Sequence, residues 1–328
     1  MLHVRFHVWP RKFPKWLNKK SELKIPQLGD FFTLLQNLRK TCKLYTMKTK
    51  RLFLFAAYHP KNIVDDALVY YVKSLSEFGD VVLCMDSDCA TSEMNKLKKY
   101  TLHTIATRHG EYDFGSYKRA YLWAYENLKL SSYDFIYLVN DSVYGPMYSL
   151  GRYFDAMENM GHDAFGLVTK KHTSHPHIQS WFIGTKPDIF LSDWFDNFMR
   201  KIKKLPDKGQ ITSQYENGFS ELVVEHGFTW DCLYYVFNRG VYNKIKKLYK
   251  SGMPFMKKVA FTRNHGGLGR QILYVLNHID KKLSDAILSS AIQQYGEKQV
   301  KWVLTKNPIK IAYRNIKHFF CKVFIEGI

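Results

Sequence analysis

The chain has 328 residues, and its 49 Lys and Arg exceed its 29 Asp and Glu by 20 formal charges. A hydrophobic content of 46% excludes wholesale disorder. No apolar run reaches the roughly 18 residues that a membrane-spanning helix needs. So large a positive charge points to an anionic partner, and nucleic acid, phospholipid and phosphorylated substrates are the candidates.

The first segment in chain order is a basic, aromatic-rich extension over residues 1–50. It holds twelve Lys and Arg against two acids, a net charge of +10. Arg11, Lys12 and Lys15 come too early for the apolar core of a secretory signal to form. The five cysteines of the chain contain no CxxC pair, which favours free thiols in a reducing cytoplasm over disulfides or a zinc site.

Residues 51–293 are predicted to form a globular domain in which strands and helices alternate. Short apolar runs predict strands over 51–57, 81–85, 101–106, 135–139, 164–168 and 180–184. Helical spacing predicts helices over 63–78, 92–99, 115–128, 188–203 and 216–226, with a loop at 204–209. This alternation indicates an α/β fold with a mostly parallel sheet, which binds its ligands beyond the carboxyl ends of the strands.

Two polar clusters follow predicted strands in the first half of this domain. Residues 108–118 (RHGEYDFGSYK) run from a strand into a helix, and two glycines there let backbone N–H groups approach a phosphate. Arg108 and Lys118 add charge, although a capping loop with a solvated Arg and Lys has the same composition. Residues 140–142 (Asn-Asp-Ser) follow an apolar strand, where Asp141 is a natural ligand for Mg²⁺ or Mn²⁺ and where an ordinary turn also fits.

Two more clusters lie in the second half. His177 and Gln179 enter an aromatic strand, and we expect hydrogen-bonding roles for both, because no second pair of metal ligands is near in sequence. Glu216 is predicted at a helix N-terminus, which favours its ionised form. An ionised carboxylate there suits a general base, and equally a first-turn Glu that supports the helix dipole.

The last segment, residues 294–328, is again basic. It carries seven Lys and Arg against two acids, a net charge of +5, among many large apolar residues. Such a mixture is typical of a helix that docks on anionic lipid headgroups, and also of an ordinary solvated face. Nucleic-acid binding is a third interpretation, but the chain contains no zinc finger, RNP-type motif or helix-turn-helix signature.

Together the clusters resemble the rhamnan synthesis protein F family of bacterial glycosyltransferases over about residues 51–265. The matching stretches are RHGEYDFGSYK (108–118), YLVNDSVYGP (137–146), HIQSWF (177–182), YENGFS (215–220) and PFMK (254–257). The resemblance implies a GT-A-like αβα sandwich. It also implies transfer of rhamnose or another hexose from a nucleotide-sugar to a growing lipid-linked cell-surface polysaccharide of O-antigen or rhamnan type.

The resemblance assigns roles to the candidate residues. Arg108, Asp113, Lys118, Asn140, Asp141 and Ser142 would bind the nucleotide-sugar, and His177 and Gln179 would line the acceptor side. Glu216 would be the base of an inverting displacement. Asp141, with His265, would hold a divalent Mn or Mg, although the usual Asp-x-Asp is here Asn140-Asp141-Ser142 and puts metal use in doubt. The literal Asp86-Ser87-Asp88 follows an early strand, and we expect it not to bind metal.

The two basic ends then indicate location. We expect a cytoplasmic protein, peripheral on the inner face of a bacterial cytoplasmic membrane, with an anionic lipid surface and other glycosyltransferases of its pathway as partners and no nucleic acid. The alternative is a non-catalytic, membrane-associated component of a polysaccharide assembly complex. Turnover of a nucleotide-sugar distinguishes the two.

Overall fold

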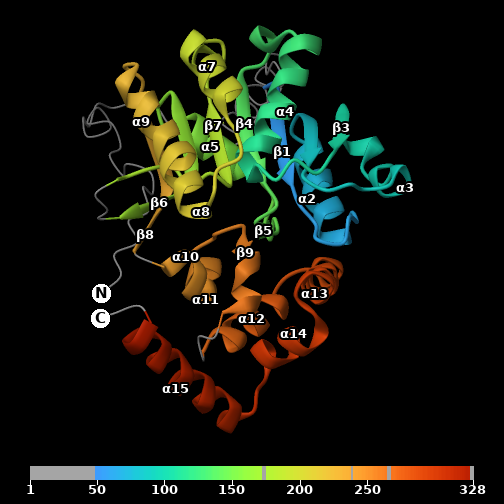
Figure 1. Cartoon of the computed structure of the whole chain (residues 1–328), viewed down its shortest axis with the longest axis vertical. Coiled ribbons are helices and arrows are strands. Elements are labelled where there is room, and N and C mark those ends of the chain that lie inside the picture. Colours follow the sequence, from blue (N-terminus) through green and yellow to red (C-terminus); the bar gives the residue numbers. More distant parts are fainter. Residues whose placement is uncertain (1–48, 172–174, 238, 264–266, 326–328) are drawn as a thin grey trace, which may run out of the picture. The chain divides into compact units, whose positions relative to one another are not determined.

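The computed structural model describes residues 49–171, 175–237, 239–263 and 267–325, and the chain from Lys50 onward belongs to one compact unit (Figure 1). The strands are β1 (Arg51–Ala57), β2 (Asp80–Met85), β3 (His103–Ala106), β4 (Phe135–Asn140), β5 (Val143–Tyr144), β6 (Ala164–Lys171), β7 (Phe182–Thr185), β8 (Trp230–Phe237) and β9 (Met256–Lys257). The longer helices are α2 (Asp66–Ser76), α4 (Tyr112–Asn127), α5 (Gly151–Glu158), α7 (Asp193–Lys201), α9 (Gly218–Glu225), α12 (Leu268–Leu276), α13 (Lys281–Tyr295), α14 (Glu297–Leu304) and α15 (Pro308–Ile325). Short helical pieces are α3 (Thr91–Met94), η2 (Lys98–Tyr100), η3 (Leu130–Ser132), α6 (Pro187–Phe190), α8 (Lys208–Ile211), η4 (Thr212–Asn217), α10 (Gly240–Asn243), α11 (Ile245–Lys250) and η5 (Lys258–Thr262).

Seven strands form the central sheet in the order β3-β2-β1-β4-β7-β6-β8. The pairs β1–β2, β1–β4, β2–β3 and β6–β8 are parallel, and β7 runs antiparallel to both β4 and β6. The predicted mostly parallel sheet is therefore confirmed. A second small sheet pairs β5 with β9, so that Val143 lies opposite Lys257 and Tyr144 opposite Met256.

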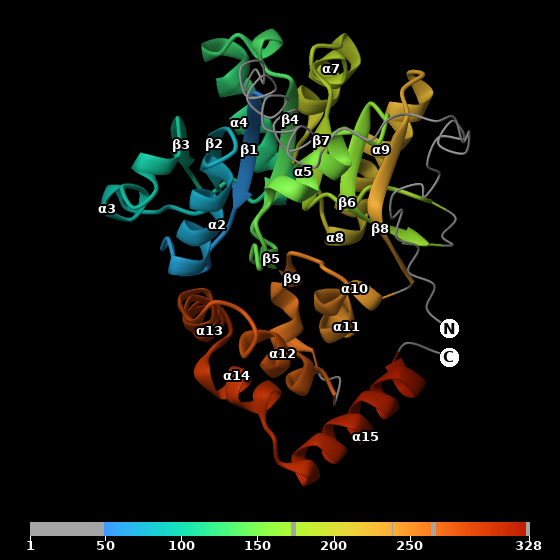
Figure 2. The same cartoon turned by 180° about the vertical axis from the view of Figure 1, so that it is seen from behind.

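Helices cover both faces of the large sheet. Alternate residues of the fully buried strand β1 enter different cores: Leu52 and Leu54 pack with α4, α7 and α9 (Figure 1), whereas Phe53 and Phe55 pack with α2 and α5 (Figure 2). Period-two alternation of a strand buried on both faces explains why its sequence reads as one continuous apolar run. The αβα architecture expected from the sequence is confirmed.

A third core builds a helical layer next to the β5–β9 sheet (Figures 1 and 2). Helices α12, α13 and α14 bury Ile272, Ile287 and Val303 there. The buried Arg314 of α15 donates from Nη1 to the carbonyl oxygens of Trp302 and Val303, both at 2.7 Å, and so fastens α15 to the end of α14. No helix among the described residues is both long and apolar enough to cross a membrane.

Several predicted bounds need correction. The helix predicted over 188–203 is two helices, α6 and α7, because the Ser192 side chain accepts from the N–H of Phe195 and starts a new helix. The predicted loop at 204–209 ends early, since α8 begins at Lys208. The basic N-terminal segment 1–50 lies, up to residue 48, outside the described residues.

Candidate functional site

A cleft of about 840 Å³ lies beyond the carboxyl ends of β1, β2 and β4. Asp86, Asp113, Asp141 and Glu216 line it together with basic residues, which are Arg108, Lys204, Lys257, Lys258 and Arg263. A cleft at this edge of a parallel sheet is the usual ligand site of an α/β fold. Its mixture of charges suits a ligand that carries both phosphate and hydroxyl groups.

The loop that precedes α4 is held by the two acids that follow β2. Asp86 Oδ1 accepts from the N–H groups of His109 and Gly110 at 2.8 and 3.0 Å, and Asp88 Oδ1 accepts from the N–H of Arg108 at 2.8 Å. Both carboxylates of the literal Asp-x-Asp sequence therefore stabilise the backbone of residues 108–110.

A histidine completes the support of this loop. His109 Nδ1 accepts from the N–H of Glu111 at 3.1 Å, so its Nε2 is left to donate to Ser116 Oγ at 3.0 Å. Burial, with the nearby Arg119, lowers the pKa of His109 and favours this neutral form. Gly115 must be glycine, because a Cβ there would lie 2.2 Å from the Cβ of Glu111.

The predicted donor-site residues Asn140, Asp113 and Ser142 are in contact. Asn140 Nδ2 donates to Asp113 Oδ2 at 2.9 Å, and Asn140 Oδ1 accepts from Ser142 N and Oγ at 3.0 and 2.7 Å. Residues 27 apart in sequence are thus joined at the end of β4. Arg108 lies at the same cleft, where it donates to Asn62 Oδ1 at 2.6 Å and stacks over Tyr58.

Asp141 forms a buried ion pair that the sequence did not reveal. Its Oδ2 lies 2.9 Å from Nζ of Lys258, and the two residues are 8% and 6% exposed. Burial alone would lower the pKa of Lys258, but attraction by Asp141 and Asp65 raises it above its ordinary value, so the ammonium stays charged. The signal in the sequence was the PFMK stretch, which ends one residue before Lys258.

Glu216 lines the cleft, but its local structure differs from the prediction. It lies in the π-helical turn η4, inside a continuous helical run from α8 to α9, and not at a helix N-terminus. Its Oε1 accepts from the N–H of Ser180 at 2.8 Å. A backbone donor, and not a helix dipole, therefore orients this carboxylate.

Four predicted site residues among those that the structure describes do not line the cleft. Asn140 is 1% exposed and contacts Asp113 and Ser142, which do line it. Lys118 of α4 donates from Nζ to the carbonyl oxygen of Ile202, the residue after α7, at 2.7 Å.

His177 and Gln179 are buried in the chain between β6 and β7. The Nδ1 of His177 lies 2.9 Å from the carbonyl oxygen of His175, and the carbonyl oxygen of His177 accepts from Thr169 Oγ1 at 2.8 Å. The Oε1 of Gln179 accepts from the Trp181 indole at 2.8 Å. His265 lies outside the described residues.

The acidic residues of the cleft do not fit a divalent metal. Among the described residues, no three His, Cys, Asp or Glu side chains converge as a metal site. The ammonium of Lys258 already holds the carboxylate of Asp141, which was the predicted ligand. Mg²⁺ is usually bound by one or two carboxylates together with substrate phosphates, and here the carboxylate predicted for it already pairs with a fixed positive charge.

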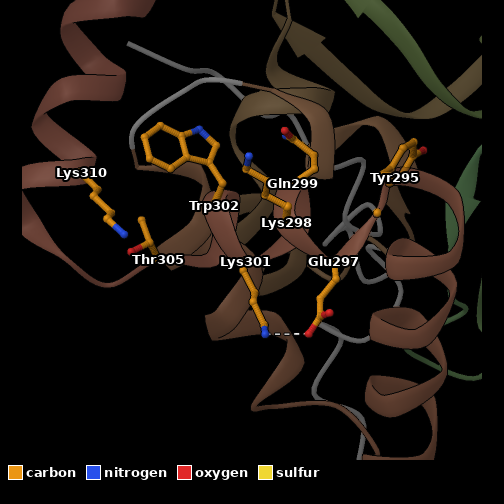
Figure 3. A pocket seen from close by; sticks show the side chains of 9 residues that line it. Tyr295, Glu297, Lys298, Gln299, Lys301, Trp302, Thr305 and Lys310 are labelled. Atoms are coloured by element: carbon orange, nitrogen blue, oxygen red, sulfur yellow. Dashed lines mark ion pairs between the residues drawn. The ribbon is translucent and has the colours of Figure 1, made fainter.

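A second hollow of about 740 Å³ lies between α14 and α15. Figure 3 shows Lys310 of α15 facing Trp302 and Thr305 of the preceding segment, with Glu297 paired to Lys301 at 2.6 Å. Glu297 is its one acid and is neutralised by that pair, so this hollow is basic and aromatic. It lacks the convergent acids of the cleft and is not a site for acid–base chemistry.

The αβα sandwich, with a cleft of acidic and basic side chains at its strand ends, is a GT-A-like fold of the kind found in nucleotide-sugar transferases. The family model described as Rhamnan synthesis protein F matches residues 81–322. The chain therefore belongs to this family, which is of glycosyltransferase type, and the protein is an enzyme of that class. The match includes most of the C-terminal segment 294–328, which lay beyond the resemblance seen in the sequence.

No curated protein sequence is significantly similar to the chain. Among solved structures, one from Desulfovibrio desulfuricans G20, provisionally assigned as a nucleotide-diphospho-sugar transferase, is 15% identical with a TM-score of 0.36, over 71% of this chain and all of that one. The mannosyltransferase Ktr4p from S. cerevisiae is 10% identical (TM-score 0.31; 48% of this chain, 61% of that one). Core-mannan synthase A from Aspergillus fumigatus in its Mn/GDP form is 11% identical (TM-score 0.29; 47% and 64%).

Proposed function

We propose that the protein transfers rhamnose or another hexose from a nucleotide-sugar to a growing lipid-linked polysaccharide of O-antigen or rhamnan type. The observation that carries this proposal is the convergence of Glu216 and Asp113 with the cleft's basic side chains at one edge of the sheet. Membership of the rhamnan synthesis protein F family supports the polysaccharide product.

In the proposed reaction, an acceptor hydroxyl oxygen attacks the anomeric carbon as the bond from that carbon to the diphosphate oxygen breaks. The hydroxyl proton passes to Glu216, and the electron pair of the broken bond goes to the diphosphate. Attack from the face opposite the leaving group inverts the anomeric configuration. Basic residues of the cleft offset the charge that develops on the diphosphate, and Asp113 holds the donor.

The role of Glu216 is tested by Glu216→Gln, which keeps the side-chain oxygen that accepts from Ser180. We expect transfer from the accepted nucleotide-sugar to fall by about 10²- to 10⁴-fold while nucleotide binding is kept. Glu225→Gln, on the same helical run but exposed, is the matched control. Transfer at the wild-type rate by Glu216→Gln would remove Glu216 from the chemistry.

The proposal extends to location, at the inner face of a bacterial cytoplasmic membrane near the lipid-linked acceptor. Helix α15 exposes Ile309, Tyr313 and Ile316 by 78%, 58% and 55%, and their spacing puts them on one helical face. Lys310 and the basic hollow of Figure 3 adjoin this face. Apolar side chains flanked by lysines suit an anionic lipid surface.

Sedimentation with vesicles tests this location. The protein should bind vesicles rich in phosphatidylglycerol and not vesicles of phosphatidylcholine, and serine at positions 309, 313 and 316 should weaken the binding. Serine at Ile292, which is 39% exposed on α13, is the control. Equal binding by the triple variant and the wild type would contradict a membrane role for α15.

A further inference from the structure

We propose that the ammonium of Lys258 is a built-in cation for the donor's diphosphate, in the place that a divalent metal would take beside Asp141. This inference rests on the proposed sugar transfer. It adds one assertion to it: the enzyme binds nucleoside diphosphates without a metal.

The position of Lys258 is fixed by backbone structure. Pairing of β5 with β9 puts Lys257 opposite Val143, and the N–H of Lys258 donates to the carbonyl oxygen of Ser142 at 3.0 Å. Asp141 is held in turn by its own N–H, which donates to Ala56 in β1 at 3.1 Å. Two chain segments 117 residues apart therefore present a cation and a carboxylate at one point of the cleft.

The ammonium has donors left for a ligand. A lysine carries three N–H donors, and among the described residues Asp141 is its one hydrogen-bond acceptor. Asp65 adds a second negative charge nearby, which keeps the buried cation charged. Both Lys258 and Asp141 line the cleft, so a phosphate oxygen there can accept from the same ammonium.

Two other acids of the cleft, Asp86 and Asp113, accept hydrogen bonds from protein groups. Asp86 Oδ1 accepts two backbone N–H groups, and Asp113 Oδ2 accepts from Asn140. A metal at Asp141 would lie beside the ammonium that already pairs with Oδ2, and the two cations would repel each other. Lys257, whose Nζ lies 3.0 Å from Ser142 Oγ, and Arg263 line the same cleft and increase its attraction for phosphate.

In the transfer step, Lys258 keeps its proton. Its charge and its hydrogen bonds stabilise the diphosphate, which receives the electron pair of the broken bond. The proton of the acceptor goes to Glu216. A desolvated, preorganised cation is effective at this task because it needs no reorganisation as the charge develops.

Calorimetric titration of the full chain with UDP, dTDP and GDP tests the inference. At least one should bind with the same affinity in EDTA and in added Mn²⁺. Lys258→Met should weaken that binding about tenfold or more, and Lys258→Arg should largely keep it. Lys281→Met, at an exposed lysine on α13, should leave it unchanged.

Because Lys258→Met leaves Asp141 buried without its partner, Lys258→Met/Asp141→Asn removes both charges and keeps the test valid if the single variant unfolds. Binding lost in EDTA and restored by Mn²⁺ would overturn the inference and leave the proposed transfer standing. Wild-type affinity in the double variant would overturn it as well. Binding of no diphosphate with or without Mn²⁺ would instead remove the proposed function, and the inference with it.

Discussion

The side-chain amide of Asn140 links Asp113 to the end of β4: its Nδ2 donates to Asp113 Oδ2 at 2.9 Å. The same amide accepts twice from Ser142 through Oδ1. Asn140 is 1% exposed, so these bonds form away from water. A group that is both donor and acceptor is needed, and a carboxylate at position 140 could not supply the donor.

Asn140→Asp should therefore lower the free energy of unfolding by about 1–3 kcal/mol, because two carboxylates would face each other in a buried place. Urea denaturation measures the change. The double variant Asn140→Asp/Asp113→Asn returns a donor to the pair and should recover part of the loss. A double variant no more stable than Asn140→Asp would contradict this account of the contact.

A second buried contact lies at the start of β1, between Arg51 and Glu158. Arg51 donates from Nε and Nη2 to the two oxygens of Glu158, both at 2.6 Å, and Tyr137 donates to Glu158 Oε1 at 2.6 Å. Glu158→Ala leaves a buried guanidinium unpaired, and we expect a loss of about 3–5 kcal/mol in chemical denaturation. Asp285→Ala, which breaks the exposed pair with Lys281, should change stability little.

Local sequence was sufficient for the elements whose pattern is strong. The continuous apolar run 51–57 is strand β1 with the predicted bounds, because a strand buried on both faces needs no alternation. Helix α4 begins at Tyr112, three residues before the predicted start at Gly115, because the acids after β2 fix the loop that precedes it. Those acids belong to a different part of the chain, so local spacing could not locate the start.

The site was predicted only in part, because some of its contacts also join segments that are far apart in sequence. Asp113, Asn140 and Ser142 were identified as polar residues at strand ends, and they do meet. Lys258 was missed because its contact with Asp141 depends on the pairing of two-residue strands far apart in sequence. Lys118 has the positive charge that suits a phosphate ligand, but its position on α4 places its ammonium against the carbonyl oxygen of Ile202.

Acid should destabilise the protein through His109. Burial, with the charge of Arg119, lowers its pKa in the folded state below the ordinary value of 6.5. The unfolded chain then binds the proton more readily than the native protein, so stability falls as the pH falls below about 6.5 and is unaffected by this group at higher pH. The melting temperature between about pH 7.5 and pH 5.5 measures the loss.

His109→Gln should reduce that difference in melting temperature, although His59, whose pKa burial also lowers, retains part of it. His278→Gln, at an exposed histidine, should leave it unchanged. An acid-induced loss identical in His109→Gln and the wild type would show that the proton binds elsewhere.

Tyr112 combines backbone strain with a position at the cleft. Its φ of 58° is in the left-handed region, which costs a bulky residue about 1–3 kcal/mol, and the residue is 49% exposed and lines the cleft. Asparagine tolerates this conformation. Tyr112→Asn should therefore raise the free energy of unfolding by about 1 kcal/mol.

We also predict that the ring of the exposed Tyr112 stacks on the base of the nucleotide. Tyr112→Asn should then weaken nucleoside diphosphate binding about tenfold, because one stacking contact is lost. Tyr125→Asn, at an exposed tyrosine on the same helix, should lower stability slightly, because ring contacts with Tyr121 and Arg200 are lost. It should leave binding unchanged, because Tyr125 does not line the cleft. Opposite signs for stability and binding at position 112 would identify strain kept for a ligand, whereas a joint loss of both would assign Tyr112 to the folding of the loop.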